Sequence, residues 1–202
     1  MTGCHRVHTM AKPLIAPALA VRVLREVQSG GITGVAGAHL TVGLAAATVG
    51  DIYLLLPDDD ARMVRGAASF AVMQTAYARL LYRYGARPTL SAVGPRLGAG
   101  VAAAALLAAR ARPIAPVLSA YGLTLGTMST LAAAPLMSRH LAVGRVAFLA
   151  SDGLVTLRRC ILRGARTRAL SEGAILTTYA LAQVLLVEGM IAAPRRSPGR
   201  LG

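Results

Sequence analysis

Two acidic residues, Asp51 and Asp152, lie within stretches made mostly of apolar and small residues, 41–57 and 141–159. A charged side chain at the centre of a membrane-spanning helix costs roughly 2.5–3.5 kcal/mol, so acids there are rare and usually functional. A carboxyl group in apolar surroundings can hold a proton or stay ionised, depending on its neighbours. The two acids are therefore the first candidates for acid–base chemistry.

Other polar residues are expected in the same half of the membrane. If the spans alternate in direction, both acids lie about one and a half helical turns before a span ends on one membrane face. Lys12 begins the first span on that face. Tyr179 and Gln183 share one side of the last span by their i,i+4 spacing, and Gln74 and Tyr77 lie near the middle of the third. Distant parts of the chain thus place polar groups in the same half of the membrane as the two acids.

Each of these residues also has a purely structural interpretation. Asp152 can form an ion pair with Arg158 or Lys12, and Gln74 and Gln183 can form hydrogen bonds between helices. Lys12 can also mark the water boundary. The shared depth of the two acids, each costly in a membrane, favours function.

The elements that must position these residues are membrane-spanning helices. Of 202 residues 55% are hydrophobic and only 15% are charged, and the mean hydropathy is +0.56. A soluble alanine-rich bundle is the alternative, but 101–109 has no polar face. Crossing about 30 Å of hydrocarbon takes roughly 20 residues. Seven stretches come close to this length, near 12–27, 32–56, 64–83, 91–109, 113–134, 141–157 and 173–193.

The predicted fold is therefore an all-α, polytopic transmembrane helix bundle of about seven spans. We expect a short N-terminal segment over 1–11, a single transmembrane domain over 12–193 and a basic tail over 194–202. The start of the chain lacks the pattern of a signal peptide, so we expect the first span to act as the anchor. Gly122 and Gly126 have the G-x-x-x-G spacing that allows close helix packing.

The basic charge belongs to a membrane surface rather than to a nucleic-acid site. The net charge is +14, but most Lys and Arg residues fall outside the apolar stretches, where they meet lipid headgroups. The 22 basic residues divide equally between the two faces, so they do not decide the orientation. Cys4 and Cys160 are expected to be unpaired thiols, and the histidines lack metal-ligand spacing. No metal or cofactor is expected.

Six motifs, taken in order, carry a resemblance to a known family. They are "AKPLIAP" (11–17), "VGDIYLLLP" (49–57), "GAASFAVMQTAY" (66–77), "YGLTLGTMSTLAA" (121–133), "GRVAFLASDGLV" (144–155) and "TTYALAQVLLVEG" (177–189). Each is weak alone, but together they resemble the membrane-embedded YhhN-like lysoplasmalogenase family over most of the chain.

The resemblance implies an α-helical membrane hydrolase of a bacterial plasma membrane, with a lysophospholipid substrate and no cofactor. Such an enzyme cleaves the vinyl ether bond of lysoplasmalogens to a fatty aldehyde and a glycerophospho-alcohol. By motif match, the resemblance implies Asp51 and Asp152 as catalytic residues and, as substrate-binding residues, Lys12, Gln74, Tyr77, Tyr179 and Gln183.

Two features depart from the family pattern. Family members usually have eight spans, so we expect the first span to be absent from this sequence or to lie upstream of it. Gln74 stands where the family commonly has a histidine.

Vinyl ether hydrolysis needs one acid that holds a proton and one that is charged. We expect Asp51, with more apolar neighbours, to be the proton donor and Asp152 to be the base or the charged group that stabilises the cation. The reverse assignment stays open. A lipid-binding protein without catalysis and a small-solute carrier are the rival functions.

Overall fold

Seven α-helices follow one another along the part of the chain that the structure describes. The computed structural model describes residues 3–56 and 58–193, with side chains from Pro13 onward, and it contains no strand within these residues. The all-α prediction is confirmed, and each expected span corresponds to one helix. The helices are α1 (Gly3–Gln28), α2 (Gly34–Tyr53), α3 (Asp60–Arg83), α4 (Leu90–Arg110), α5 (Ala115–Leu131), α6 (Arg139–Cys160) and α7 (Ala165–Ala192).

The helices extend beyond the apolar stretches in places, because polar residues continue a helix outside hydrocarbon. Helix α7 begins at Ala165, whereas its apolar stretch begins near residue 173. Four of the described helices, α2, α4, α6 and α7, are long and apolar enough to cross a membrane. The chain is therefore a membrane protein.

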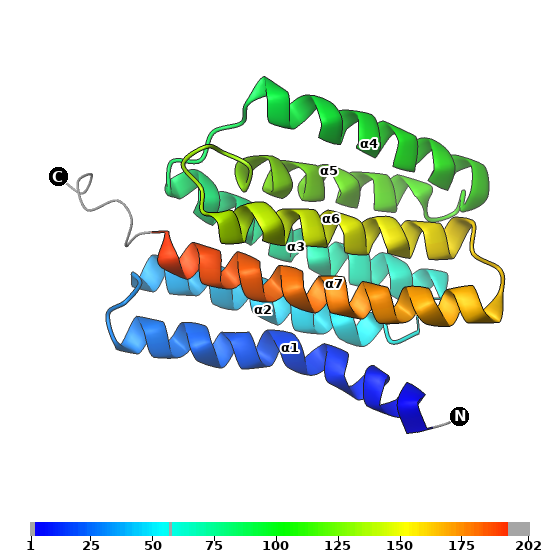
Figure 1. Cartoon of the computed structure of the whole chain (residues 1–202), viewed down its shortest axis with the longest axis horizontal. Helices are drawn as coiled ribbons and strands as arrows, with labels where there is room; N and C mark the ends of the chain where they lie inside the picture. Colours follow the sequence, from blue (N-terminus) through cyan, green and yellow to red (C-terminus); the bar gives the residue numbers. More distant parts are fainter. Residues whose placement is uncertain (1–2, 57, 194–202) are drawn as a thin grey trace.

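Successive connections alternate between the two ends of the bundle, so neighbouring helices in sequence run antiparallel (Figure 1). Helix α3 packs between α2 and α5, and α7 packs between α1 and α6. Helix α4 lies at the edge of the bundle, where it packs against α5 and touches α6. Residues from five different helices can therefore meet around one interior space.

Two glycines of α2 allow the close contact with α3 that positions two aromatic side chains. A Cβ at Gly43 would collide with the ring of Tyr77, and one at Gly50 would lie 2.7 Å from the ring of Phe70. Both rings are buried. Small residues on α2 thus fix the place of Tyr77 and Phe70.

A cluster of ion pairs joins the α2–α3 connection to the α6–α7 end. Arg158 forms ion pairs with Asp58 at 3.2 Å and with Glu172 at 2.8 Å. Arg168 lies 2.7 Å from Asp58. Burial raises the pKa of Asp58, but hydrogen bonds and charges from Arg158 and Arg168 outweigh this and hold it below its ordinary value. The sequence offered Arg158 as a partner for Asp152, and in the structure Arg158 forms ion pairs with Asp58 and Glu172.

Candidate functional site

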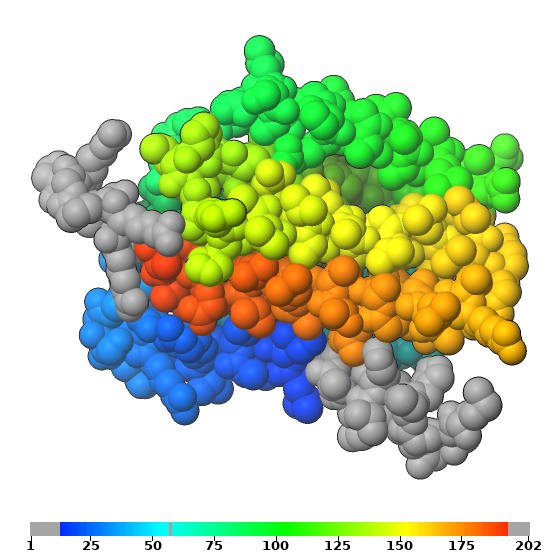
Figure 2. All heavy atoms as spheres, viewed as in Figure 1, coloured from blue at the N-terminus to red at the C-terminus, as the bar shows by residue number. Residues whose placement is uncertain are grey.

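A cavity of about 920 Å³ lies among α3, α4, α5, α6 and α7. Most of its wall is apolar, with Leu106, Leu107, Leu118 and Val155 among its residues. Figure 2 shows a recess between α4 and α6 on the face drawn. A cavity of this size and polarity suits an apolar ligand with a few polar groups.

Small residues create part of this space. The sequence predicts that Gly122 and Gly126 serve close helix packing, and this is wrong. Both glycines line the cavity, and a Cβ added at either would have nothing within 4 Å. Their lack of a side chain leaves room inside the bundle instead.

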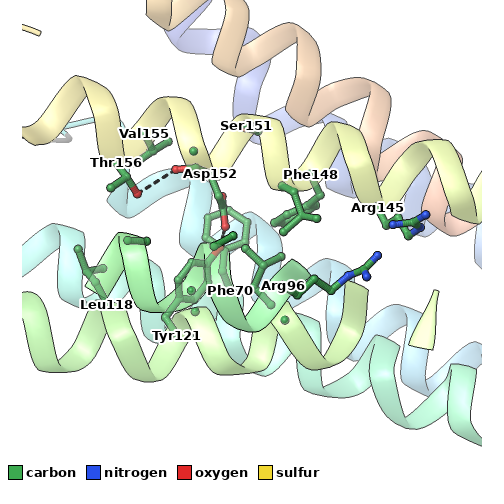
Figure 3. Close-up of a pocket in the computed structure, with 18 of the residues that line it drawn as sticks. Phe70, Arg96, Leu118, Tyr121, Arg145, Phe148, Ser151, Asp152, Val155 and Thr156 are labelled. Carbon is green, nitrogen blue, oxygen red and sulfur yellow. Dashed lines mark hydrogen bonds between the residues drawn. The ribbon is translucent and has the colours of Figure 1, made fainter. Parts of the chain in front are cut away.

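Asp152 lies on the cavity wall near the middle of α6, with Tyr121 of α5 facing it (Figure 3). The Tyr121 hydroxyl donates a hydrogen bond of 2.5 Å to Oδ2 of Asp152. The backbone oxygen of Asp152 accepts a bond of 3.0 Å from Thr156. The carboxyl group is therefore held by a neighbouring helix and faces a largely apolar space.

Gln74 is fully buried beside the Asp152 pair. Its Oε1 accepts a hydrogen bond from the hydroxyl of Thr124, which also donates to the backbone oxygen of Tyr121 at 2.8 Å. Its Nε2 has no hydrogen-bond partner among the described residues. Gln74 thus supports the α5 turn that carries Tyr121.

Asp51 is 0% exposed and belongs to a second polar network. The Tyr179 hydroxyl donates to Oδ2 of Asp51 at 2.8 Å, and Gln183 donates from Nε2 to that hydroxyl at 3.1 Å. The Tyr77 hydroxyl donates to Oε1 of Gln183 at 3.3 Å. Residues of α2, α3 and α7 are joined in this way.

Tyr179 connects this second network to the cavity. It lines the cavity, and its ring contacts Phe70 and Phe148 edge-on, with centroids 5.8 and 6.1 Å away. Asp152 also lines the cavity, whereas Asp51 is not among the described residues that do. The two acids therefore occupy different positions relative to the same space.

Two arginines lie at one end of the cavity, on α4 and α6 (Figure 3). Arg96 donates to the hydroxyl of Ser129 at 2.8 Å and to the backbone oxygen of Ala92. Arg145 has a buried Nε with no hydrogen-bond partner among the described residues. At the other end, Arg159 is paired with Asp60.

The structure brings most of the predicted site residues together, in two groups. Tyr77, Tyr179 and Gln183 join Asp51, and Gln74 joins the group of Asp152. Lys12 lies in α1, but its side chain is outside the described part of the chain. Among the described residues no group of histidine, cysteine and acidic side chains could hold a metal.

Sequence reasoning missed four functional candidates: Tyr121, Thr124, Arg96 and Arg145. Tyr121 and Thr124 belong to the quoted motif "YGLTLGTMSTLAA", and an intramembrane tyrosine beside small residues was the available signal. The available signal for the two arginines was their position inside the expected spans 91–109 and 141–157, where a charge is costly, whereas Arg110 and Arg139 lie just outside these spans.

The comparisons agree with the motifs. The family model described as the YhhN family matches residues 7–190, which is nearly the whole chain. No curated protein and no solved structure gives a match.

Proposed function

The chain belongs to the YhhN family, and on that premise we propose that it hydrolyses the vinyl ether bond of lysoplasmalogen-type lipids. The products are a fatty aldehyde and a glycerophospho-alcohol. The observation that carries this proposal is the apolar cavity with the Asp152–Tyr121 pair on its wall. A recess between α4 and α6 gives a single-chain lipid a route from the membrane into this space.

The reaction begins with proton transfer to carbon. Protonated Asp152 gives its proton to the β carbon of the vinyl ether, which leaves an oxocarbenium ion beside the new carboxylate. Water adds to this cation and returns a proton to Asp152, forming a hemiacetal. The hemiacetal loses its hydroxyl proton as the glycerol oxygen gains one, and the carbon–oxygen bond breaks. The acid ends as it began, so one residue on the wall serves as acid and then as base.

Of the two assignments considered for the acids, this is the reverse of the one that the sequence favoured. The donor must lie within hydrogen-bonding reach of the reacting atom, and Asp152 is the acid that lines the cavity. Asp51 acts through Tyr179, whose hydroxyl donates a hydrogen bond to the Asp51 carboxylate. In apolar surroundings, a fixed negative charge near the cation stabilises it more than it would in water. Gln183 and Tyr77 hold that phenol in place.

Purified protein in detergent tests the proposal through aldehyde release. Lysoplasmalogen is compared with a lysophospholipid of the same chain length that has a saturated ether. We expect aldehyde only from the vinyl ether. The matched control variant is Glu188→Gln, which removes an acid from α7 that pairs with Arg22 at 3.2 Å, and it should keep full activity.

Other outcomes separate the rival functions. Binding of both lipids without aldehyde would make the protein a lipid-binding protein and overturn the hydrolase. Flux of a small solute into proteoliposomes, without lipid hydrolysis, would make it a carrier.

A further inference from the structure

We propose that Arg96 and Arg145 bind the phosphate of the lipid whose chain occupies the cavity. This inference rests on the proposed function and deepens it, because it assigns the headgroup end of the substrate. Both guanidinium groups reach the same end of the cavity, from α4 and α6 (Figure 3). Arginine is well suited to phosphate, because its planar donors match two phosphate oxygens at once.

The two arginines lack acidic partners among the described residues, unlike Arg22, Arg158, Arg159 and Arg168, which form ion pairs. None of the ion pairs formed by the described residues includes Arg96 or Arg145. Their like charges lie close enough to act on each other. Placing two repelling cations on the wall of a largely apolar cavity is unfavourable unless an anion joins them.

Their hydrogen-bonding capacity is also only partly used. Arg96 donates from Nε to Ser129 and from Nη1 to Ala92, which orients its guanidinium group. The buried Nε of Arg145 has no partner among the described residues, although buried donors are nearly always satisfied. A phosphate oxygen at this end of the cavity would satisfy it.

The spacing along α6 fits a glycerophospholipid. Arg145 lies seven residues before Asp152, which is about 10.5 Å along the helix axis and on nearly the same helix face. An extended glycerol unit places the vinyl ether carbon roughly 8–9 Å from the phosphorus at ordinary bond lengths. A lipid with its phosphate at Arg145 would therefore present its vinyl ether to Asp152. Its chain would continue toward Leu118 and Val155, which lie beyond Asp152 in the cavity.

A simpler role for the arginines is contact with the headgroups of the surrounding membrane. Arg110 and Arg139, on the same two helices, are exposed and do not line the cavity. They are suited to that role, and they supply matched controls for the two cavity arginines.

Binding of two unreactive probes tests the phosphate site without any hydrolysis. One probe is a saturated alkyl lysophosphatidylcholine, and the other is the alkylglycerol of the same chain without phosphate. We expect Arg96→Gln and Arg145→Gln each to weaken binding of the first probe by about 10- to 100-fold, the usual loss for a charge-assisted hydrogen bond. Alkylglycerol binding should not change. Arg110→Gln and Arg139→Gln should bind both probes as the parent protein does.

Arg145→Lys keeps the charge, so it tests the site even if the glutamine variant does not fold. Lysine cannot bind two oxygens in a plane, so we expect binding of the phospholipid to weaken by about tenfold while alkylglycerol binding stays unchanged. Equal losses for both probes, or no loss for either, would overturn the phosphate site.

A third probe, inorganic phosphate, distinguishes a lipid phosphate from a free one. We expect millimolar phosphate not to displace the phospholipid, because the chain in the cavity adds most of the affinity. Displacement at that concentration would overturn the assignment to a lipid. Arginine-dependent phospholipid binding in a protein that releases no aldehyde would leave the phosphate site standing and overturn only the proposed hydrolase.

Discussion

Asp51 and Asp152 are alike in the sequence, each a lone acid near the end of an apolar stretch, but the bundle gives them different surroundings. Asp152 lines a cavity and accepts a hydrogen bond from Tyr121. Asp51 is fully buried and is linked to the cavity through Tyr179. Two costly carboxylates in one bundle therefore need not share one task. Asp152 is placed to contact a ligand in the cavity. Asp51 is placed to influence the same ligand through the phenol of Tyr179.

Replacing the wall acid should have the largest effect. Asp152→Asn keeps the size of the side chain but removes the proton donor, so turnover should fall by about 10²- to 10⁴-fold. The measurement is aldehyde release in a single turnover at saturating lysoplasmalogen. Binding of the saturated lysophospholipid should be retained, which shows that the variant is folded. Full turnover by this variant would end the assignment of Asp152 as the donor.

Replacing the buried acid should have a smaller effect on the same assay. Asp51→Asn removes a charge that acts through Tyr179, and we expect turnover to fall by about 10- to 100-fold. The double variant should be little slower than Asp152→Asn alone, because residues acting on one step are not additive. If Asp51→Asn were the slower single variant, the roles of the two acids would be exchanged.

Removing the Tyr179 hydroxyl, which links the buried acid to the cavity, should reduce turnover less than either acid substitution. Tyr179→Phe removes the hydroxyl that bonds Asp51 but keeps the ring that contacts Phe70 and Phe148. We expect about a tenfold loss of turnover, typical of one lost hydrogen bond to a charged group. In the Asp51→Asn background the same change should have little further effect. A full tenfold loss there would show that Tyr179 acts independently.

The helices and some local pairs could be predicted from the sequence, because they depend on spacing along the chain. The i,i+4 pair Tyr179 and Gln183 does share a helix side and forms a hydrogen bond of 3.1 Å. Gln74 and Tyr77, also close in sequence, belong to different networks, because each meets a different neighbouring helix. Contacts between helices depend on how the helices pack, which their own periodicity does not give. The cavity beside Asp152 also depends on how the helices pack, so the sequence alone could not predict it.

A packing change should disturb the surroundings of Asp51 more than those of Asp152. Gly43→Ala would push a methyl group into the ring of Tyr77, whose hydroxyl bonds Gln183 in the Asp51 network. Overpacking of this kind costs about 1–3 kcal/mol of unfolding free energy. Thermal unfolding in detergent measures it, with Gly122→Ala as the control, because that position opens into the cavity. Equal destabilisation by both variants would contradict the packing described for α2 and α3.

The smallest effect is expected for an acid outside the hydrocarbon. Asp58→Asn removes the ion pairs with Arg158 and Arg168, and since the carboxylate is 61% exposed its loss should cost at most about 1 kcal/mol. The folded-state pKa of Asp58 is lowered, so its contribution is present above the ordinary carboxyl pKa and is lost as pH falls through the folded value. Unfolding followed from pH 7 to pH 3 should show the variant and the parent protein converging in stability at the acid end. A difference in unfolding free energy that stays constant between pH 7 and pH 3 would contradict the assignment of this stability to the ionised Asp58 carboxylate.

Chemical labelling compares the two acids most directly. An apolar carbodiimide reacts with protonated carboxyl groups that it can reach from the membrane, and peptide mass spectrometry locates the adduct. The structure and the proposed mechanism predict labelling of Asp152, loss of activity in proportion to it, and protection by the saturated alkyl lysophospholipid. Asp51 should stay unlabelled under the same conditions. Labelling of Asp51 ahead of Asp152, or labelling of Asp152 that the lipid does not prevent, would contradict the claim that Asp152 is the acid that meets the substrate.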